Sequence, residues 1–150
     1  MLEIRHHGAL SPDSFESVAE VDWFAMKSSQ VRFDGQEVTV DTFLRKKTLL
    51  GQSRSFLCGG VQFIWSDRSS GNLELRREGT DVVIASCIDS STSEDFRLHI
   101  SPGAHVVGFD LIVLSALIVH HKREDRRLRA RLGVKGRNER RKKDDGDDEY

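Results

Sequence analysis

Residues 106–119 read Val-Val-Gly-Phe-Asp-Leu-Ile-Val-Leu-Ser-Ala-Leu-Ile-Val, which is the most apolar run in the chain. Residues 120–132 are rich in helix formers, and Gly133 is a good C-terminal stop. We therefore expect one helix from about Phe109 to Leu132. Its first half is apolar on all sides and should be buried on all sides, whereas its charged second half should lie in water. The expected core residues of this helix are Leu111, Ile112, Val113, Leu114, Leu117 and Ile118.

The same run could instead cross a membrane. Its 14 residues fall short of the roughly 20 that a bilayer span needs. It also contains Asp110, and a carboxylate near the middle of a span costs about 3 kcal/mol on insertion scales. The basic residues that follow would suit a cytosolic flank, so a C-terminal single-span protein is the weaker alternative to a core helix.

The chain before this helix has the pattern of a mainly β domain. Strand-like stretches recur at spacings of roughly 8–12 residues, as in sandwiches and barrels. Asp34-Gly35 and Gly59-Gly60 favour tight hairpin turns. A short helical turn that holds Phe43 and Leu44 is also predicted, with Asp41 as its N-cap. The predicted strands are residues 17–24, 30–33, 37–40, 55–57, 61–65, 73–76, 82–87 and 96–100.

Length and composition favour one domain. The 150 residues, 37% hydrophobic and 31% charged, are enough to bury a core without staples. We expect a weakly structured N-terminus at residues 1–16, the β domain at 17–132 and a disordered charged tail at 133–150.

Two cysteines cannot form a disulfide framework, so both are predicted to be core thiols in a reducing compartment. The first residues show no secretory signal, and a cytoplasmic location is predicted.

Charge is distributed in blocks along the chain. Residues 1–121 carry a net charge of −5, whereas residues 122–143 hold 12 basic and 3 acidic side chains. Five acidic residues then follow at 144–150. Such blocks act as solvated tails or as electrostatic contact sites. The basic block also leaves nuclear entry open.

No motif in the sequence indicates an enzyme. Ser115 lies in the apolar run without a nearby base or oxyanion site, so we expect it to bond to its own helix. Gly59-Gly60 lacks the Lys and Ser/Thr of a phosphate loop. The histidine pairs at 6–7 and 120–121 have no partner ligands at metal-site spacing. The sequence therefore predicts a non-enzymatic protein with no cofactor and no metal site.

Several short motifs occur in a fixed order. They are Val-Ala-Glu-Val-Asp-Trp at 18–23, Val-Arg-Phe-Asp-Gly at 31–35, Val-Thr-Val-Asp-Thr-Phe-Leu-Arg-Lys-Lys at 38–47, Ser-Phe at 55–56, Phe-x-Trp at 63–65, and the run 110–119 with its Lys-Arg-Glu continuation. In this order they resemble the tubby C-terminal-like superfamily, which includes tubby, the phospholipid scramblases and the plant LURP-one-related proteins. Most similar in detail is a fungal, mostly basidiomycete, family known only as a domain of unknown function.

The resemblance covers about residues 18–127 and implies a particular fold. That fold is an antiparallel β-barrel wrapped around one central apolar helix. This chain has fewer predicted strands than the superfamily, and less chain before residue 18. The expected architecture is therefore mainly β, with a tubby-like barrel that can be incomplete around the C-terminal helix.

Two basic groups are the candidate contact sites. The first functional hypothesis is that they bind anionic phospholipid headgroups at a membrane surface, as tubby members of the superfamily imply, because each basic side chain near an anionic leaflet contributes about 1 kcal/mol. The alternative is a protein-interaction or scaffold domain with no ligand of its own. Nucleic acid is less favoured, since residues 135–143 contain no aromatic side chain for base stacking. The candidate contact residues are Arg45, Lys46, Lys47, Lys122, Arg123, Arg126 and Arg127.

Overall fold

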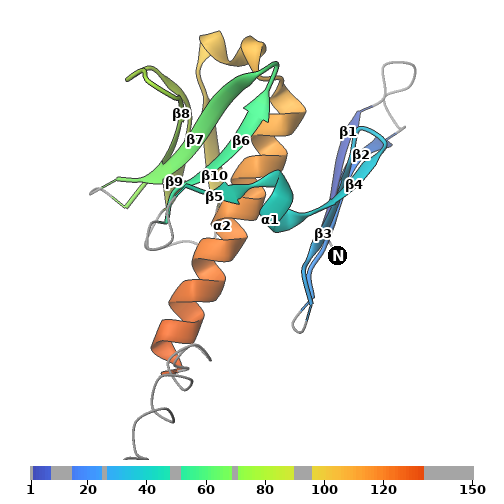
Figure 1. The fold of residues 1–150 in the computed structure, drawn as a ribbon, viewed down its shortest axis with the longest axis vertical. Coiled ribbons are helices and arrows are strands. Elements are labelled where there is room, and N and C mark those ends of the chain that lie inside the picture. The colour runs from blue at the N-terminus through green and yellow to red at the C-terminus, as the bar shows by residue number, and fades with distance from the viewer. Residues whose placement is uncertain are drawn as a thin grey trace, which may run out of the picture. The chain divides into compact units, whose positions relative to one another are not determined.

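The structure is a computed structural model that describes residues 2–7, 15–24, 27–47, 52–68, 71–89 and 96–133. The chain divides into two compact units, Met1–Val119 and His120–Tyr150. The described residues form ten strands in two antiparallel sheets, two short helices and one long helix. Figure 1 draws the first sheet in blue, the second mostly in green and the long helix in orange.

The first sheet contains the four N-terminal strands in chain order. They are β1 (Leu2–His7), β2 (Phe15–Asp22), β3 (Gln30–Phe33) and β4 (Gln36–Thr39). The hairpin predicted at Asp34-Gly35 is confirmed, because both residues adopt positive φ angles of 50° and 71° between β3 and β4. Such angles are those of the primed turns that join two antiparallel strands.

Strand β1 lies within the segment that we predicted to be weakly structured. Its backbone pairs with β2 from Leu2 opposite Val21 to His7 opposite Phe15. The structure therefore differs from the prediction for this segment. The strand was not predicted because residues 1–16 show no clear strand pattern of their own. The strand is held by backbone pairing with β2, a long-range interaction that local sequence does not reveal.

Strand alternation gives the first sheet two different faces. Ala19, Val21 and Val31 are buried on one face. Glu20 and Arg32 are directly opposite each other on the other face, and Arg32 is also opposite Glu37. Because side chains alternate along a strand, the apolar positions face the core and the charged positions face solvent.

A short helix, α1 (Val40–Phe43), connects the two sheets along the chain. Its N-cap is Thr39, whose Oγ1 accepts a 3.1 Å hydrogen bond from the backbone N–H of Thr42. The prediction that Asp41 caps this helix is therefore wrong. Asp41 lies inside the first turn, where a carboxylate interacts favourably with the helix dipole.

The second sheet has six antiparallel strands in the order β10-β9-β8-β7-β6-β5. The glycines of the hairpin predicted at Gly59-Gly60 have φ angles of 57° and 77°, which confirms that turn between β6 and β7. The strands are β5 (Arg45–Lys46), β6 (Arg54–Cys58), β7 (Val61–Asp67), β8 (Leu73–Arg77), β9 (Val83–Asp89) and β10 (Phe96–Ile100).

The long helix α2 (Phe109–Arg131) follows a short 3-10 helix, η1 (Pro102–Val106). Its observed end lies one residue before the predicted end at Leu132. Gly108 precedes it with a φ of 87°, a left-handed conformation that favours glycine. The backbone carbonyl of Gly108 then accepts from the N–H of Ile112 at 3.2 Å.

The apolar half of α2 contributes to the core of the first unit. Ile112, Leu114 and Ile118 are fully buried, and burying a side chain of this size stabilises the fold by about 1.5–3 kcal/mol. Leu111, Val113 and Leu117 are only half-buried, so this half is not covered on all sides as we expected. The largest fully buried side chains are Trp65, Leu44, Leu75, Ile112, Leu114, Ile118, Val21, Val31, Val40 and Ser115.

The prediction of a mainly β fold with one C-terminal helix is confirmed. Among the described strands, the two sheets are separate and no closed barrel is formed. Cys58 is half-buried and Cys87 is buried, and both are free thiols. The described residues include no helix that is both long and apolar enough to cross a bilayer, which is the element that the single-span alternative requires.

Candidate functional site

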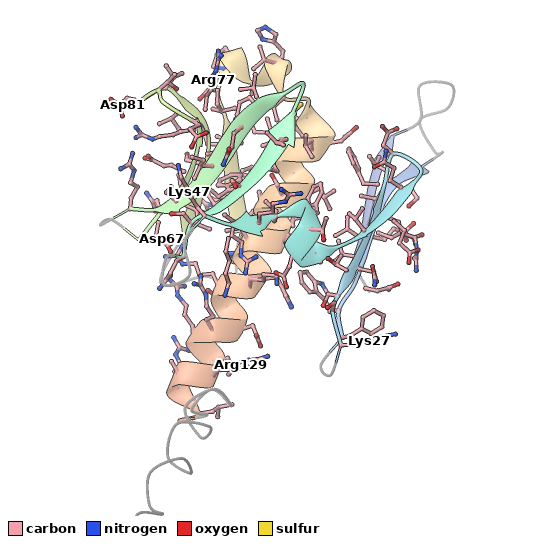
Figure 2. All side chains as sticks on the ribbon, viewed as in Figure 1. Lys27, Lys47, Asp67, Arg77, Asp81 and Arg129 are labelled. Carbon is pink, nitrogen blue, oxygen red and sulfur yellow. The ribbon has the colours of Figure 1, made fainter. Side chains whose placement is uncertain are left out.

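The first basic group is divided by the geometry of strand β5. Arg45 pairs with Ser55 and Lys46 pairs with Arg54, so strand alternation directs the two basic side chains to opposite faces of the sheet. Lys47, which is labelled in Figure 2, forms a 2.8 Å ion pair with Glu78. The three consecutive basic residues therefore do not form a single cluster.

Arg45 borders a pocket between α1 and the edge of the second sheet. The pocket has a volume of about 260 Å³. None of the residues that line it is acidic, and several carry side-chain hydrogen-bond donors. Such a lining favours an anionic or strongly accepting ligand over a cation. The lining residues are Thr42, Phe43, Arg45, Ser55, Phe56, Leu57 and Gln62.

Arg45 differs from Arg32 and Arg76, which belong to ion-pair networks of the two sheets. Arg32 contacts three carboxylates and Arg76 contacts two. Within the part of the chain that the structure describes, the exposed Arg45 side chain has no ion-pair or hydrogen-bond partner. Its charge is therefore available to a ligand in the pocket.

The α1 wall of the pocket is fixed by Arg54, a half-buried arginine of β6. Nη1 of Arg54 donates hydrogen bonds to Oδ1 of Asp41 at 3.1 Å and to the backbone carbonyl of Leu44 at 3.0 Å. The Arg54 side chain is only 11% exposed. Because charge-assisted hydrogen bonds are directional, these contacts hold the end of α1 against β6. Arg54 thereby positions Thr42 and Phe43 at the pocket.

The second basic group lies on α2 in the other compact unit. Arg127 forms a 2.7 Å ion pair with Glu124, and Nε of Arg126 donates to the carbonyl of Lys122 at 3.3 Å. Arg123 is only 8% exposed, so the expectation that the whole second half of α2 lies in water is wrong at this residue. The first basic group lies in the first unit and this group lies in the second.

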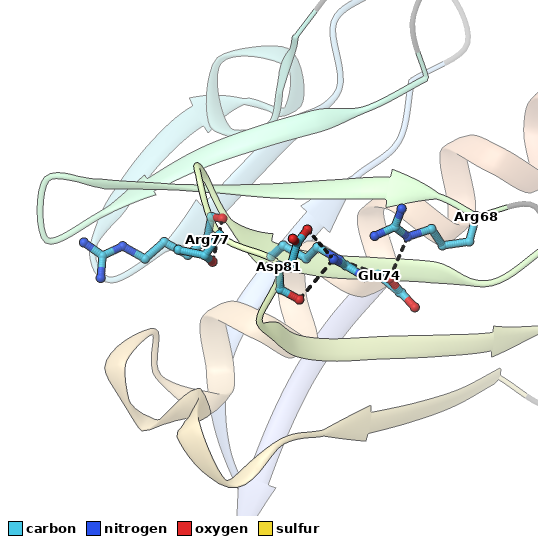
Figure 3. Close-up of polar contacts among 6 residues, drawn as sticks. Arg68, Glu74, Arg77 and Asp81 are labelled. Carbon is cyan, nitrogen blue, oxygen red and sulfur yellow. Dashed lines mark hydrogen bonds and ion pairs between the residues drawn. The ribbon is translucent and has the colours of Figure 1, made fainter.

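A third charged cluster is structural. Oε2 of Glu74 accepts hydrogen bonds from Arg68 at 2.7 Å and from Arg76 at 2.7 Å (Figure 3). Arg76 also contacts Oδ1 of Asp81 at 3.2 Å, whereas the side chain of Arg77 points away from the network (Figure 3). The bonds from Arg68 and Arg76 hold the pKa of Glu74 below its ordinary value. The charges satisfy one another and tie β8 to the turn that precedes β9.

Ser115 has the environment of a core residue. Its Oγ donates to the carbonyl of Ile112 at 3.0 Å, which confirms the predicted bond to its own helix. The same oxygen accepts a 3.0 Å hydrogen bond from Nε1 of Trp65. Sequence reasoning did not identify Trp65 as this second partner, and it also missed the pocket beside Arg45. Both depend on pairing between segments that are distant in the sequence.

The fold and the site define a class of protein: a mainly β domain of two antiparallel sheets and one C-terminal helix, with a basic pocket at the edge of the second sheet. The chain belongs to a family of unknown function, DUF6593, whose family model matches residues 3–125. No curated protein matches the chain, and no solved structure matches it.

Proposed function

We propose that this protein is a non-enzymatic domain that binds an anionic phospholipid headgroup in the pocket beside Arg45. The observation that carries the proposal is the exposed Arg45 side chain in a pocket without acidic lining residues. Thr42, Ser55 and Gln62 add donors that suit phosphate oxygens. A guanidinium can hold a phosphate with two parallel hydrogen bonds, which favours this ligand over a neutral one.

Apolar side chains at the same pocket favour a lipid as the source of the anion. Leu57 is 64% exposed, and the half-buried Phe43 lines the pocket with it. Exposed apolar surface beside a cationic group suits an amphiphile whose headgroup is charged and whose remainder is apolar. The proposal includes a location in the cytoplasm at the surface of a membrane.

The resemblance to the tubby-like superfamily supports the same proposal. The segment from Val38 to Lys47 is one of the motifs that carry the resemblance. It contains both the α1 wall of the pocket and Arg45. A relationship to that superfamily, and to its fungal members in particular, is part of the proposal.

A non-enzymatic role is consistent with the environment of the serine in the core helix. Ser115 is fully buried, and its hydroxyl is engaged with both Ile112 and Trp65. A nucleophilic serine needs access to substrate and a neighbouring base. Ser115 has neither in this arrangement, so we assign it to packing of the core.

The direct test is co-sedimentation of the full chain with vesicles. Neutral phosphatidylcholine vesicles are compared with vesicles that contain added phosphatidylserine or a phosphorylated inositol lipid, at physiological salt. We expect binding only to the anionic vesicles, with a loss of binding as salt is raised. Equal binding to neutral vesicles, or no binding to either type, would reject the headgroup role and favour the protein-interaction alternative.

A further inference from the structure

The C-terminal half of α2 presents two large apolar side chains to solvent. Leu128 is 55% exposed and Leu132 is 67% exposed. They are four residues apart, so they share one face of the helix. This helix half belongs to the second compact unit, and its exposed leucines play no part in the core described above.

These leucines can be placed in the register of a helix–helix contact. His121, Asp125, Leu128 and Leu132 are separated by four, three and four residues. This alternation places them at the a and d positions of two heptads, where a partner helix packs in a coiled coil. We call this row the seam. Two of its members are apolar and two are polar, and polar residues in such a row specify the partner and the register.

The positions that border the seam are predominantly basic. Lys122, Glu124, Arg129 and Arg131 occupy the flanking e and g positions of the same heptads. Glu124 is paired with Arg127 at 2.7 Å, and Arg129 is paired with Asp125 at 2.9 Å. Arg129 lies on the exposed end of α2 (Figure 2). Charges at e and g positions determine which partner helix is accepted, so a basic border selects an acidic one.

We propose that the C-terminal half of α2 docks an amphipathic helix of a partner protein, with leucine-type residues along its apolar face and glutamates or aspartates along both borders. The leucines of the seam supply apolar contact, and the basic border supplies charge complementarity. This interaction is independent of the pocket beside Arg45. The partner is defined by its chemistry, as an acidic, amphipathic helix.

A second copy of this chain fits the seam poorly. In a parallel pair, Asp125 would face Asp125 of the other copy across the apolar row, although Glu124 would lie near Arg129. In an antiparallel pair, Lys122 would lie against Arg129, and the attraction between Glu124 and Arg131 would only offset this repulsion. Like charges in these positions oppose association. The charge pattern therefore favours a partner of different sequence.

A bilayer is also a poor occupant of the seam. A helix that lies in an anionic membrane surface needs a broad apolar face and a basic polar face. Here the apolar face consists of Leu128 and Leu132, and Asp125 lies one turn before them on the same face. That carboxylate would be turned toward anionic headgroups, whereas a partner helix can place a neutral or basic residue opposite it.

The test uses the full chain and two designed helical peptides that differ only in the charge of their borders. Both carry leucines at the a and d positions; one has glutamates at e and g, and the other has lysines there. We expect the glutamate peptide to bind at least about tenfold more tightly by isothermal titration. The charge-reversal variant R129E/R131E should invert this preference.

The variant L128A/L132A tests the apolar contribution. It should weaken binding of the glutamate peptide about tenfold or more, while its melting temperature stays at the wild-type value because both leucines are exposed. Equal affinity for the two peptides would overturn the proposal, and so would wild-type affinity for the glutamate peptide in L128A/L132A. The proposal would also be overturned if the full chain bound neither peptide while L128A/L132A lost binding to anionic vesicles. If Arg45→Gln reduces binding to anionic vesicles and L128A/L132A leaves it unchanged, the pocket beside Arg45 and the seam are independent sites.

Discussion

The indole Nε1 of Trp65 donates a 3.0 Å hydrogen bond to Oγ of Ser115, and both side chains are fully buried. Trp65 lies in β7 and Ser115 lies in the N-terminal half of α2. The bond therefore joins the second sheet to the apolar half of the helix. It also provides a hydrogen-bond acceptor for the indole N–H, which is the one polar group of a buried tryptophan side chain.

We predict that Ser115→Ala destabilises the protein by about 1–3 kcal/mol, because the buried indole N–H loses its acceptor. Urea unfolding measures the change. The double variant with Trp65→Phe should cost less than the sum of the single variants, since the partners lose the same interaction. Strict additivity in this cycle would show that the hydrogen bond does not couple β7 to α2.

Leu114→Ala should cost about 2–5 kcal/mol, because Leu114 is fully buried and its truncation leaves a cavity in the core. Phe109→Ala is the matched control in the same helix. Phe109 is 66% exposed, so its truncation should cost about 0.5 kcal/mol or less. Thermal or urea unfolding of the two variants gives the comparison. Similar costs for both would contradict a core role for the apolar half of α2.

The network around Glu74 makes stability depend on pH in the acid range. Its pKa in the folded protein is held below the ordinary 4.5 by Arg68 and Arg76. Its ionised form therefore stabilises the fold above about pH 4.5, and this contribution is lost as pH falls through the lower folded pKa. We expect Glu74→Gln to be less stable than wild type at pH 7 and the difference to shrink on acidification. Parallel stability curves from pH 7 to pH 3 would show that the network contributes nothing.

Arg32 neutralises a row of carboxylates on the first sheet. It contacts Glu20 at 2.6 Å, Asp22 at 2.8 Å and Glu37 at 2.9 Å, and these partners raise its pKa. Arg32→Gln leaves unneutralised carboxylates on β2 and β4, the two strands that flank β3, so we expect a lower melting temperature that high salt partly restores. Arg97→Gln removes the same charge from an exposed position in β10. A salt response that is equal in both variants would count against the network.

Local signals in the sequence were sufficient for the helix and the hairpins. The limits of α2 follow from an apolar run and from Gly133, and both hairpin turns follow from glycine-containing dipeptides. Strands β1 and β5 were missed because their stability comes from pairing with β2 and β6 rather than from their own pattern. The same reason explains why the pocket beside Arg45 could not be predicted from the sequence. The sequence singled out Arg45, Lys46 and Lys47 as basic, but only the pairing of Arg45 with Ser55 places it at the pocket.

The most direct test of the account compares Arg45→Gln with Arg97→Gln in binding to vesicles that contain anionic lipid. Both variants remove one positive charge from an exposed strand position of the second sheet. If the pocket beside Arg45 holds the headgroup, Arg45→Gln should lower the partition coefficient about fivefold or more, as expected for the loss of about 1 kcal/mol, and Arg97→Gln should leave it near the wild-type value. Equal losses in the two variants, with both proteins folded, would show that the membrane senses only overall charge and would contradict a headgroup site at Arg45.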